Sequence, residues 1–440
     1  MTYKFPPRNA LGNNEKKAIQ QVIQYYNKKK VDPGYQGYFE DKLCKKFSKM
    51  MGGGYTDACS SGTTAAYIAI SALNLKKGSE VLISPVTDSG PLNAIILLGL
   101  KPKLIDSSLN SYNVSLKEFM KRASRKTKAA IIMHIGGEAS QIHEICIEAK
   151  KRKIKIIEDC SQAPFAKSIW SKKYYDICKK KYVGSFGDIS FFSTMYSKTI
   201  SSCGSAGLVF TKNKKLYHQV LAHADRGKQI WKKNINLKDP SKALYPALNF
   251  NSNEFSSAIS LASLNRVKVT IKKRVNFLKK LNKCLKESKI CYIEYQNFDL
   301  FSPFYISISL RLNLLKISKL KFVEEIRKEG IPLLNSYGCI ISDWSWAKKY
   351  MQDKFVTKNA INFKNKSFNL FLNENYSSKE TTGRAIYEVK PDFIKKYFVE
   401  IDCFCYKKQS LLPREKSTYT ITFYIDPKII SDLKAIDIRD

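Results

Sequence analysis

Six short apolar runs between residues 80 and 210 alternate with segments of helical periodicity. The runs are EVLIS at 80–84, PKLID at 102–106, AAIIM at 129–133, IKIIE at 154–158, DISFF at 188–192 and AGLVF at 206–210. Strands that alternate with helices of this length form βαβ units around a mostly parallel sheet. Such a sheet is buried on both faces, which agrees with the continuous apolar runs. The sequence therefore predicts an α/β fold.

The rest of the chain indicates a second, smaller domain. Residues 254–287 have the periodicity of one long helix or two in series. Residues 300–376 alternate again, with FYISISL as a strand and ISKLKFVEEIRKEG as a helix that ends in glycine. We predict an N-terminal segment 1–40, a large domain 41–287, a smaller C-terminal α/β domain 288–390 and an extension 391–440 of unknown role, with a strand in TYTITFYI at 418–425.

The charge of the chain is strongly basic but evenly spread. Among 440 residues, 76 Lys and Arg face 38 Asp and Glu, a formal charge of +38. No run of 5–8 basic residues and no motif that reads RNA or DNA occurs, so we expect no nucleic-acid partner. A genome-wide lysine bias explains a diffuse excess, and a preference for anionic small substrates agrees with it equally well.

Several classes of protein are excluded or disfavoured by composition. A hydrophobic content of 44% supplies a core and rules out general disorder. No apolar run approaches the ~18 residues that cross a bilayer, and the first residues lack a signal peptide's apolar stretch. The eleven cysteines are scattered without a CxxC pair, which favours reduced thiols and no metal site. We therefore expect a cytoplasmic protein without membrane partners.

Small hydroxyl residues and a glycine open the helical pattern AAYIAI, in the segment Ser60-Ser61-Gly62-Thr63-Thr64. The first turn of a helix has free N–H groups and the positive end of the helix dipole, so a phosphate can bind there. The same residue types form an ordinary Ser/Thr N-cap, which is the interpretation that the segment favours when taken alone.

A second segment, Ile157-Glu158-Asp159-Cys160-Ser161-Gln162-Ala163, ends an apolar strand with acids. In open α/β sheets ligands bind at the carboxyl ends of the strands, so a carboxylate here is placed to contact one. A helix N-cap at Asp159 is an equally good interpretation of this segment alone.

A third segment places Lys198 between two buried strands. Gly184-Ser185-Phe186-Gly187-Asp188 and the strand ISFFS precede it, and the glycine-rich return Ser202-Cys203-Gly204-Ser205-Ala206-Gly207 follows it. A lysine by itself is uninformative in so lysine-rich a chain, but this setting is informative.

The three segments together match the requirements of pyridoxal 5′-phosphate (PLP). This cofactor needs a phosphate cup at a helix start, an acid at the pyridine nitrogen and a lysine for the Schiff base. The acid keeps the ring nitrogen protonated, so that the ring can accept the electrons of a substrate carbanion. Each segment is a weak signal alone, but their order along the chain is much more specific and predicts PLP as the cofactor.

The motifs SSGTTAA, IEDCSQA, GSFGDISFFSTMYSK and NFNSNEFSSAISLASLNRV resemble those of the fold-type I, PLP-dependent sugar aminotransferases of the DegT/StrS family. The resemblance covers about residues 35–390. It implies a fold-type I transferase that moves an amino group from glutamate to a keto-sugar, most often a nucleotide-linked one, for amino-sugar and polysaccharide biosynthesis.

The resemblance also implies which residues act. Lys198 would form the Schiff base and shuttle the proton between the substrate carbon and the cofactor. Asp159 would pair with the pyridinium nitrogen, and Gln162 would lie near the phenolic oxygen of the ring.

The phosphate group would have partners from both subunits of a homodimer. Gly62, Thr63 and Ser193 would hold it within one chain, and Asn249 would reach it from the partner subunit.

Some positions depart from the family pattern. After PVT the family usually has an aromatic residue that stacks on the ring, and this chain has Asp88. Where many members have HLYG, this chain has His134-Ile135-Gly136-Gly137. The stretch between Ala163 and Gly184 is longer than usual and suggests an extra loop.

Other residues have two interpretations each. His134 either touches the cofactor or is a satisfied structural histidine. Tyr337, Trp344 and Trp346 either line a sugar pocket or belong to the core. The run Asn373-Glu374-Asn375 fits the cap of a local turn better than a binding site.

Two other functions stay open. One is a PLP-dependent sugar dehydratase, although such family members tend to replace the Schiff-base lysine with histidine or to carry cysteines for an iron–sulfur cluster. The other is a binding or regulatory protein that keeps the fold without catalysis, which Asp88 leaves possible. A visible absorption band of the lysine-bound cofactor would distinguish a PLP enzyme from the second.

Overall fold

The computed structural model describes residues 8, 11–168, 181–202, 204–295 and 297–376, together with four short strands beyond them. The chain forms two units, Met1–Asn375 and Tyr376–Asp440. In the second unit, β14 (Thr381–Gly383) pairs with β16 (Gln409–Leu411) and β15 (Phe398–Asp402) pairs with β17 (Thr422–Ile425). Strand β17 lies within the strand predicted at 418–425, whose first residues fall outside the described part.

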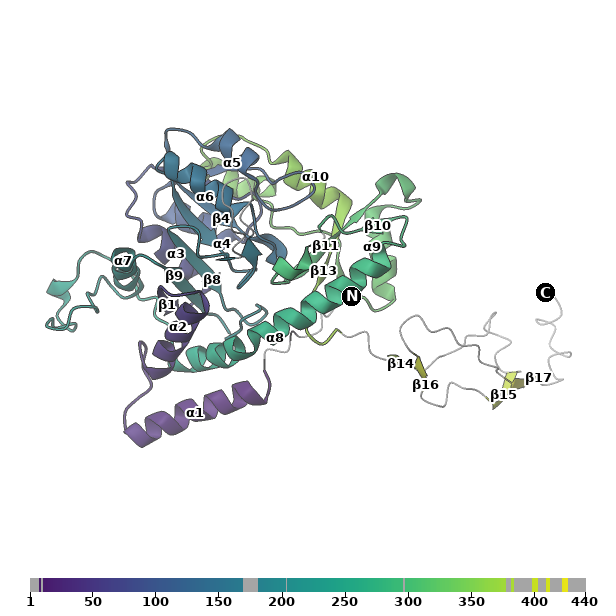
Figure 1. Ribbon diagram of the computed structural model, residues 1–440, viewed down its shortest axis with the longest axis horizontal. Helices are drawn as coiled ribbons and strands as arrows, with labels where there is room; N and C mark the ends of the chain where they lie inside the picture. Colours follow the sequence, from purple (N-terminus) through teal and green to yellow (C-terminus); the bar gives the residue numbers. More distant parts are fainter. Residues whose placement is uncertain are drawn as a thin grey trace, which may run out of the picture. The chain divides into compact units, whose positions relative to one another are not determined.

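A seven-stranded sheet forms the centre of the first unit, in the order β1-β9-β8-β5-β4-β2-β3 (Figure 1). Neighbouring strands from β8 to β3 are parallel, whereas β9 is antiparallel to both β8 and β1. The predicted mostly parallel sheet is therefore confirmed. Its strands are β1 (Tyr55–Cys59), β2 (Glu80–Ile83), β3 (Lys101–Leu104), β4 (Thr127–Met133), β5 (Lys155–Asp159), β8 (Ile189–Ser193) and β9 (Gly207–Thr211).

Two details of this sheet differ from a simple βαβ series. In the connection from β8 to β9, the described residues 194–202 and 204–206 contain no helix, and the chain returns beside β8 in the antiparallel direction. Strand β1 was not predicted, because YTDAC is too polar to read as an apolar run, although Thr56 and Asp57 are buried within it.

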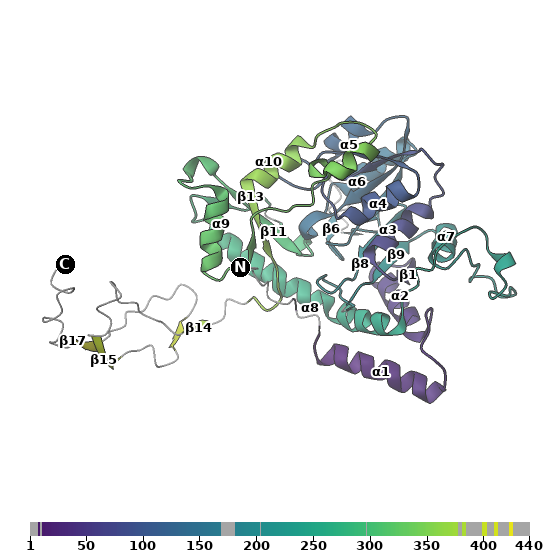
Figure 2. The ribbon, with the colours of Figure 1, turned by 180° about the vertical axis from the view of Figure 1, so that it is seen from behind.

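Helices cover both faces of the sheet, as Figures 1 and 2 show from opposite sides. The helices that follow strands are α3 (Gly62–Ser71), α4 (Ser89–Leu97), α5 (Leu116–Arg122), α6 (Ile142–Lys151) and α7 (Lys214–Ala224). Alternating side chains of the strands enter two separate cores: Ile83 packs with α3, α4 and α7, and Leu82 with α5 and α6. This arrangement exposes the ends of the strands, where ligands bind in such folds.

Helix α8 (Glu254–Leu285) is a single helix of 32 residues. It begins at Asn253, whose Oδ1 accepts a hydrogen bond from Ser256 N (2.8 Å). It packs against α1 (Asn13–Lys29) and α2 (Tyr38–Met50) at one end and reaches the second sheet at the other (Figure 1). Of the two predicted alternatives, one helix rather than two is correct.

The second sheet of the first unit is antiparallel, in the order β10-β11-β13-β12. Its strands are β10 (Cys291–Tyr292), β11 (Tyr305–Leu310), β12 (Leu333–Leu334) and β13 (Ser367–Phe371), and its helices are α9 (Lys319–Lys328) and α10 (Lys358–Lys366). Helix α9 begins after its N-cap Ser318 and is followed by Gly330 at φ +81°, as the sequence predicts. Strands β6 (Lys167–Ser168) and β7 (Lys181–Tyr182) pair in the antiparallel direction as a separate two-stranded sheet.

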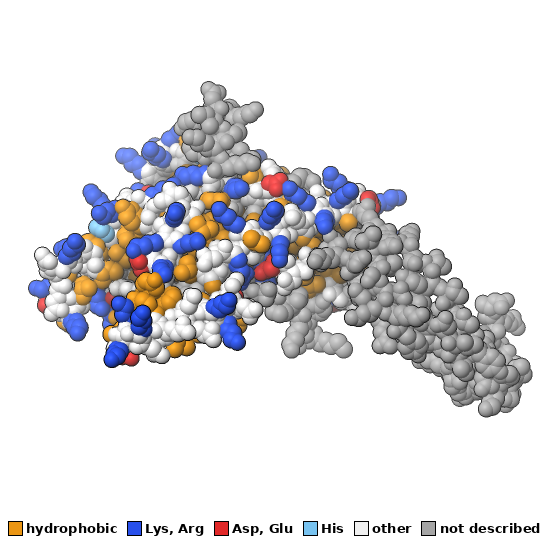
Figure 3. All heavy atoms as spheres, turned by 60° about the horizontal axis from the view of Figure 1, so that its bottom comes forward, with side chains coloured by type: hydrophobic (Ala, Val, Ile, Leu, Met, Phe, Trp, Pro, Cys, Tyr) orange, Lys and Arg blue, Asp and Glu red, His pale blue; other side chains and the backbone are white. Residues whose placement is uncertain are grey.

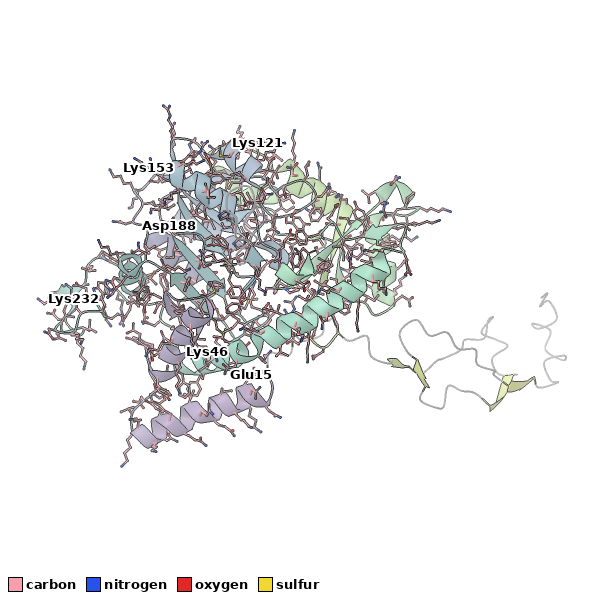
Figure 4. The ribbon with its side chains drawn as sticks, in the orientation of Figure 1. Glu15, Lys46, Lys121, Lys153, Asp188 and Lys232 are labelled. Carbon is pink, nitrogen blue, oxygen red and sulfur yellow. The ribbon has the colours of Figure 1, made fainter. Side chains whose placement is uncertain are left out.

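Basic side chains are distributed over many elements. On the face drawn in Figure 3 they are interspersed with apolar and neutral groups. The lysines labelled in Figure 4, Lys46, Lys121, Lys153 and Lys232, are all exposed and come from different parts of the chain. Among the described residues, none of the helices combines the length and the apolar character needed to cross a bilayer.

Candidate active site

The start of α3 lies against the end of β8. Ser61 caps the helix: its Oγ accepts from Thr64 N (3.0 Å), and Thr64 Oγ1 accepts from Ser61 N (2.9 Å). A Cβ on Gly62 would lie 2.7 Å from Ser193 Cβ, so this approach requires glycine. Among the described residues, the N–H groups of Gly62 and Thr63 have no acceptor. The N-cap is therefore real, and it still leaves two donors beside Ser193.

Strand β5 ends in two acids that point to opposite faces of the sheet. Glu158 is fully buried, and its carboxylate accepts hydrogen bonds of 2.6–2.8 Å from the backbone N–H groups of Gly184, Phe186 and Gly187. The glycine-rich segment before β8 thus encloses a structural carboxylate. This role of Glu158 was not predicted.

Asp159 points to the other face and is also buried. Its Oδ1 accepts from Ser161 N at 2.9 Å. Residues 160–166 form turns and not a helix, so the alternative of a helix N-cap at Asp159 is wrong. The carboxylate instead closes a local turn and faces the charge of Lys198.

Lys198 lies in the loop of residues 194–202, which we call the Lys198 loop. Within it, Lys198 N donates to Met195 O (2.9 Å) and Ser202 N donates to Thr194 O (2.8 Å). The Nζ of Lys198 lies 4.6 Å from the ring centroid of Phe304, at the start of the second sheet. The loop therefore presents Lys198 between the two sheets.

Burial controls the titration of Lys198 and Asp159. It lowers the pKa of Lys198 to about 8, with Asp159 opposing this shift and Arg8 adding to it. Burial also raises the pKa of Asp159 above its ordinary value, with Ser161 and Lys198 opposing. A lysine of pKa near 8 is partly neutral near neutral pH, and the neutral amine is the form that attacks a carbonyl carbon.

Gln162 connects the site to the second sheet. It is buried, its Oε1 accepts from Gly136 N (2.9 Å), and its Nε2 donates to Tyr337 OH (2.6 Å). The ring of Tyr337 lies 5.0 Å from the ring of Tyr305. A cavity of about 510 Å³ begins at Gly136 and Tyr305. Within the described structure the buried Tyr305 hydroxyl has no hydrogen-bond partner.

Asp88 is the N-cap of α4. Its Oδ1 accepts from Gly90 N at 3.0 Å, and its negative charge favours the protonated form of Lys198. A Cβ on Gly90 would lie 2.6 Å from Thr63 Oγ1, so this capped turn packs directly against the start of α3. Asp88 thus belongs to the same site as Thr63 and Lys198.

His134 is a structural residue. It is fully buried, its Nδ1 accepts from Ser140 N (3.1 Å), and its Nε2 lies 3.1 Å from Glu158 Oε2. Because Nδ1 accepts a backbone hydrogen bond, Nε2 carries the proton that is shared with the carboxylate. The thiol of Cys160 lies close to His134 and Glu158. The polar atoms of His134 and Glu158 are already hydrogen-bonded to each other and to backbone N–H groups.

Asn249 is exposed and lies away from the Lys198 loop in sequence, in the segment before α8. It forms a β-bridge with Asp225, and its Oδ1 accepts from Asn251 Nδ2 at 2.7 Å. Asn251 in turn bridges to Cys59, at the end of β1. The predicted contact with a partner subunit is not tested by a single chain.

The remaining predicted residues divide between site and core. Tyr337 reaches the site, whereas Trp344 packs on the core that contains α3 and α4, and Trp346 stacks on it at the surface. Asn373 Oδ1 accepts from Asn375 N (2.9 Å), which confirms the predicted turn cap.

Two residues of the site, Arg8 and Arg274, had no local signal in the sequence. Arg8 donates to Ser197 O (2.9 Å) and to Phe304 O (3.0 Å), and Arg274 donates to Thr199 Oγ1 (3.3 Å). The residues of these contacts are 75 to 296 positions apart, so only the folded chain brings them together.

The mostly parallel sheet with its smaller antiparallel companion is the architecture of the fold-type I, PLP-dependent transferases. Residues 13–383 match the family model of the DegT/DnrJ/EryC1/StrS aminotransferase family, and the chain belongs to this family. A second family model, of the cytochrome c oxidase assembly protein CtaG/Cox11, matches residues 348–440 and overlaps the first.

The chain is similar to several known proteins. It is 32% identical over 235 residues to GDP-perosamine synthase from Escherichia coli O157:H7, a match that covers 52% of this chain and 58% of the relative. The chain thus matches less than two thirds of that relative's length.

Solved structures share its fold. The aminotransferase from Psychrobacter cryohalolentis superimposes with a TM-score of 0.74 at 19% identity, covering 85% of this chain and 95% of its own. The E. coli GDP-4-keto-6-deoxy-D-mannose-3-dehydratase with bound hydrated PLP has a TM-score of 0.74 at 21% identity, covering 85% and 96%. Both likenesses concern the fold alone.

Proposed function

We propose that this protein is a PLP-dependent aminotransferase that moves an amino group from an amino acid, with glutamate as the donor, to a nucleotide-linked keto-sugar. The single observation that supports it most is the meeting of Lys198, Asp159 and the free N–H groups of α3 in one site. The chain's membership of an aminotransferase family supports the same conclusion.

The residues present fit PLP. The glycine-permitted contact between Gly62 and Ser193 leaves two N–H donors at a helix start, which suits a phosphate. Asp159, buried and facing a lysine, suits a protonated pyridine nitrogen. The side-chain NH2 of Gln162 has two hydrogens and donates one of them to Tyr337 OH, so within the described structure the other would suit the phenolic oxygen of the ring. When bound, PLP supplies the electron sink that lets a carbon lose its proton.

The protein's own groups then have separate tasks. Lys198, with its pKa lowered to about 8, gives and takes the proton at the substrate carbon close to neutral pH. Asp159 keeps the ring nitrogen protonated, and Asp88 holds the turn that abuts Thr63. The experiment that tests the whole proposal adds PLP and then glutamate to the protein. We expect a visible band that glutamate bleaches and that a nucleotide-linked keto-sugar restores.

A dehydratase on the same fold would give a different product. The neighbour structure named as a dehydratase keeps this alternative open. Mass spectrometry of the converted sugar separates the two functions, because only transamination adds an amino group. A protein with no visible band would instead be a non-catalytic member of the family.

We predict that the acceptor carries a nucleotide diphosphate. The relative named GDP-perosamine synthase supports a nucleotide-linked sugar, and the formal charge of +38 favours an anionic ligand. The apparent association rate should fall as ionic strength rises. The measurement compares kcat/KM for a nucleotide-linked keto-sugar and for the free sugar. Equal values would contradict the prediction.

We further predict a homodimer with a shared site, in which Asn249 reaches the phosphate of the partner subunit. A Lys198→Ala chain mixed with an Asn249→Asp chain tests it, since both parent homodimers should be nearly inactive. Each hybrid dimer has one site with both lesions and one intact site. Activity should recover toward about a quarter of wild type, because half the dimers are hybrids with one good site each. No recovery despite proven subunit exchange would place Asn249 outside a shared site.

The domain division at 41–287 and 288–390, the cytoplasmic location and the absence of nucleic-acid partners remain proposals. All strands of the seven-stranded sheet come before α8 in the sequence, and all strands of the second sheet come after it. This order supports a boundary near residue 287.

A further inference from the structure

The residues directly before and after Lys198 are each hydrogen-bonded to an arginine from a distant segment of the chain. On one side, Arg8 donates from Nη1 to Ser197 O (2.9 Å) and from Nη2 to Phe304 O (3.0 Å). On the other side, Arg274 donates from Nη1 to both Thr199 Oγ1 (3.3 Å) and Pro303 O (3.0 Å). Arg8 therefore joins Ser197 to Phe304, and Arg274 joins Thr199 to Pro303. Pro303 and Phe304 directly precede β11 of the second sheet.

The first arginine also packs on aromatic rings. The Cζ of Arg8 lies 4.2 Å from the ring centroid of Phe304 and 4.6 Å from that of Phe371. The Nζ of Lys198 lies 4.6 Å from the same Phe304 ring. A planar guanidinium can make two directed hydrogen bonds and stack on a ring at once, which a lysine cannot do.

The second arginine is anchored in the core. Arg274 is 1% exposed, and its Nη2 lies 2.7 Å from Glu374 Oε2. Although burial opposes it, the charge of Arg274 holds the pKa of Glu374 below its ordinary value. This ion pair fixes the guanidinium in place, so its bond to Thr199 transmits the position of α8 to the Lys198 loop.

We propose that Arg8 and Arg274 are positioning residues that clamp the Lys198 loop to the start of the second sheet. This inference rests on the proposed function for its catalytic meaning. Its geometric content, that the two arginines hold residues 197 and 199, is independent of any cofactor. The clamp keeps the Nζ of Lys198 in one place while the amino donor leaves and the acceptor sugar binds. This matters because a shift of about 1 Å in a reacting group can cost about 10²-fold in rate.

Two variants test the clamp while sparing the core. Arg8→Gln removes the first set of bonds. Thr199→Val removes the side-chain acceptor of Arg274 and leaves the Arg274–Glu374 pair intact, whereas removal of Arg274 itself would take the nearer cation from a buried carboxylate and leave it, among the described residues, only Arg266 at 3.5 Å. Arg311→Gln is the matched control, because Arg311 also bonds a backbone carbonyl, Lys289 O (3.0 Å), and stacks on a ring, Tyr292, but at the far end of β11.

The first measurement is amide hydrogen exchange of residues 195–202 in the full chain without PLP. We expect exchange to be about tenfold faster in Arg8→Gln and in Thr199→Val, the order of the effect of one lost hydrogen bond to a charged group. The control should match wild type. Unchanged exchange in either variant would overturn the two-sided clamp.

The second measurement concerns the pH at which the protein captures PLP. The charged or titratable groups that face Lys198 are Asp159, Asp88, Arg8 and the Cys339 thiol, and burial raises the pKa of that thiol above its ordinary value. The positive charge of Arg8 disfavours the ammonium form, so Arg8→Gln should raise the midpoint of capture above about 8. Thr199→Val should leave the midpoint unchanged, because it removes no charge. An unshifted midpoint in Arg8→Gln would contradict the placement of its charge beside Lys198.

The third measurement is the half-reaction with glutamate. Both variants should lower its rate constant about tenfold or more, with a smaller change in the concentration of glutamate needed for half the rate. If wild type bound no PLP, the proposed function would fail while hydrogen exchange still tested the clamp. If wild type reacted and both variants reacted equally fast, the catalytic role of the clamp would be refuted.

Discussion

Replacing Lys198 with alanine is expected to abolish transamination and leave the fold intact. The Lys198 loop is held by backbone bonds and by contacts of residues 197 and 199, none of which uses the Lys198 side chain. Its ammonium is destabilised by burial, which lowers its pKa to about 8. Removing it should therefore cost little stability, and it takes away the amine that bonds the cofactor and moves the proton.

Borohydride reduction and mass spectrometry check this prediction. Wild-type protein should carry the reduced cofactor on the peptide that contains Lys198, and Lys198→Ala should carry none. Lys319→Ala is the matched control, because burial also lowers the pKa of Lys319 to about 8, yet Lys319 binds the carbonyls of Lys364 and Ser367 far from the site. A Lys198→Ala protein that transaminates at the normal rate would refute the assignment.

Replacing Asp159 with asparagine is expected to preserve cofactor binding and to slow turnover by orders of magnitude. Asparagine keeps the size of the side chain and its bond from Ser161 N, but it lacks the negative charge that holds a proton on the ring nitrogen. Each tenfold loss of rate corresponds to ~1.4 kcal/mol of barrier.

Single-turnover rates with glutamate measure this effect. Asp106→Asn is the matched control, since Asp106 is also a buried carboxylate that follows a strand, but it accepts hydrogen bonds from Asn359 N (2.9 Å) and Ala360 N (3.2 Å). It should change stability and not the rate of the half-reaction. A loss of less than about threefold in Asp159→Asn would mean that this carboxylate only closes the local turn.

The sequence predicts the centre of the candidate site well, because its signals are local. Strand ends carry Asp159 and Ser193, a helix start carries Gly62, and Lys198 follows directly after β8. Each can be located from a short window of hydrophobic pattern and turn residues. The parallel order of the strands then brings these windows to one edge of the sheet.

The surroundings of the site could not be predicted, because they depend on contacts between distant segments. Neither the apolar pattern nor the turn signals relate Arg8 to Ser197, or Arg274 to Pro303. Two neighbouring acids also look alike in sequence. The carboxylate of Glu158 accepts hydrogen bonds from three backbone N–H groups, whereas that of Asp159 accepts one, from Ser161 N. The alternation of side chains along β5 places them on opposite faces of the sheet, and only Asp159 lies on the face of the proposed site.

Helix α8 has a consequence for how substrates enter. Its 32 residues contain no proline or glycine, and at about 1.5 Å per residue it extends for about 48 Å as a continuous rod. In its first half Arg266 forms an ion pair with Glu15 of α1 (3.0 Å), and in its last two turns Lys279 forms one with Asp299 (2.7 Å), beside the second sheet. Because sharp kinks are most often found at such helix-breaking residues, we expect this helix to oppose a hinge motion between the two sheets. We expect substrates to enter the active site through an opening that is already present. The rate of entry would then depend on the motion of loops and not on the closure of two domains.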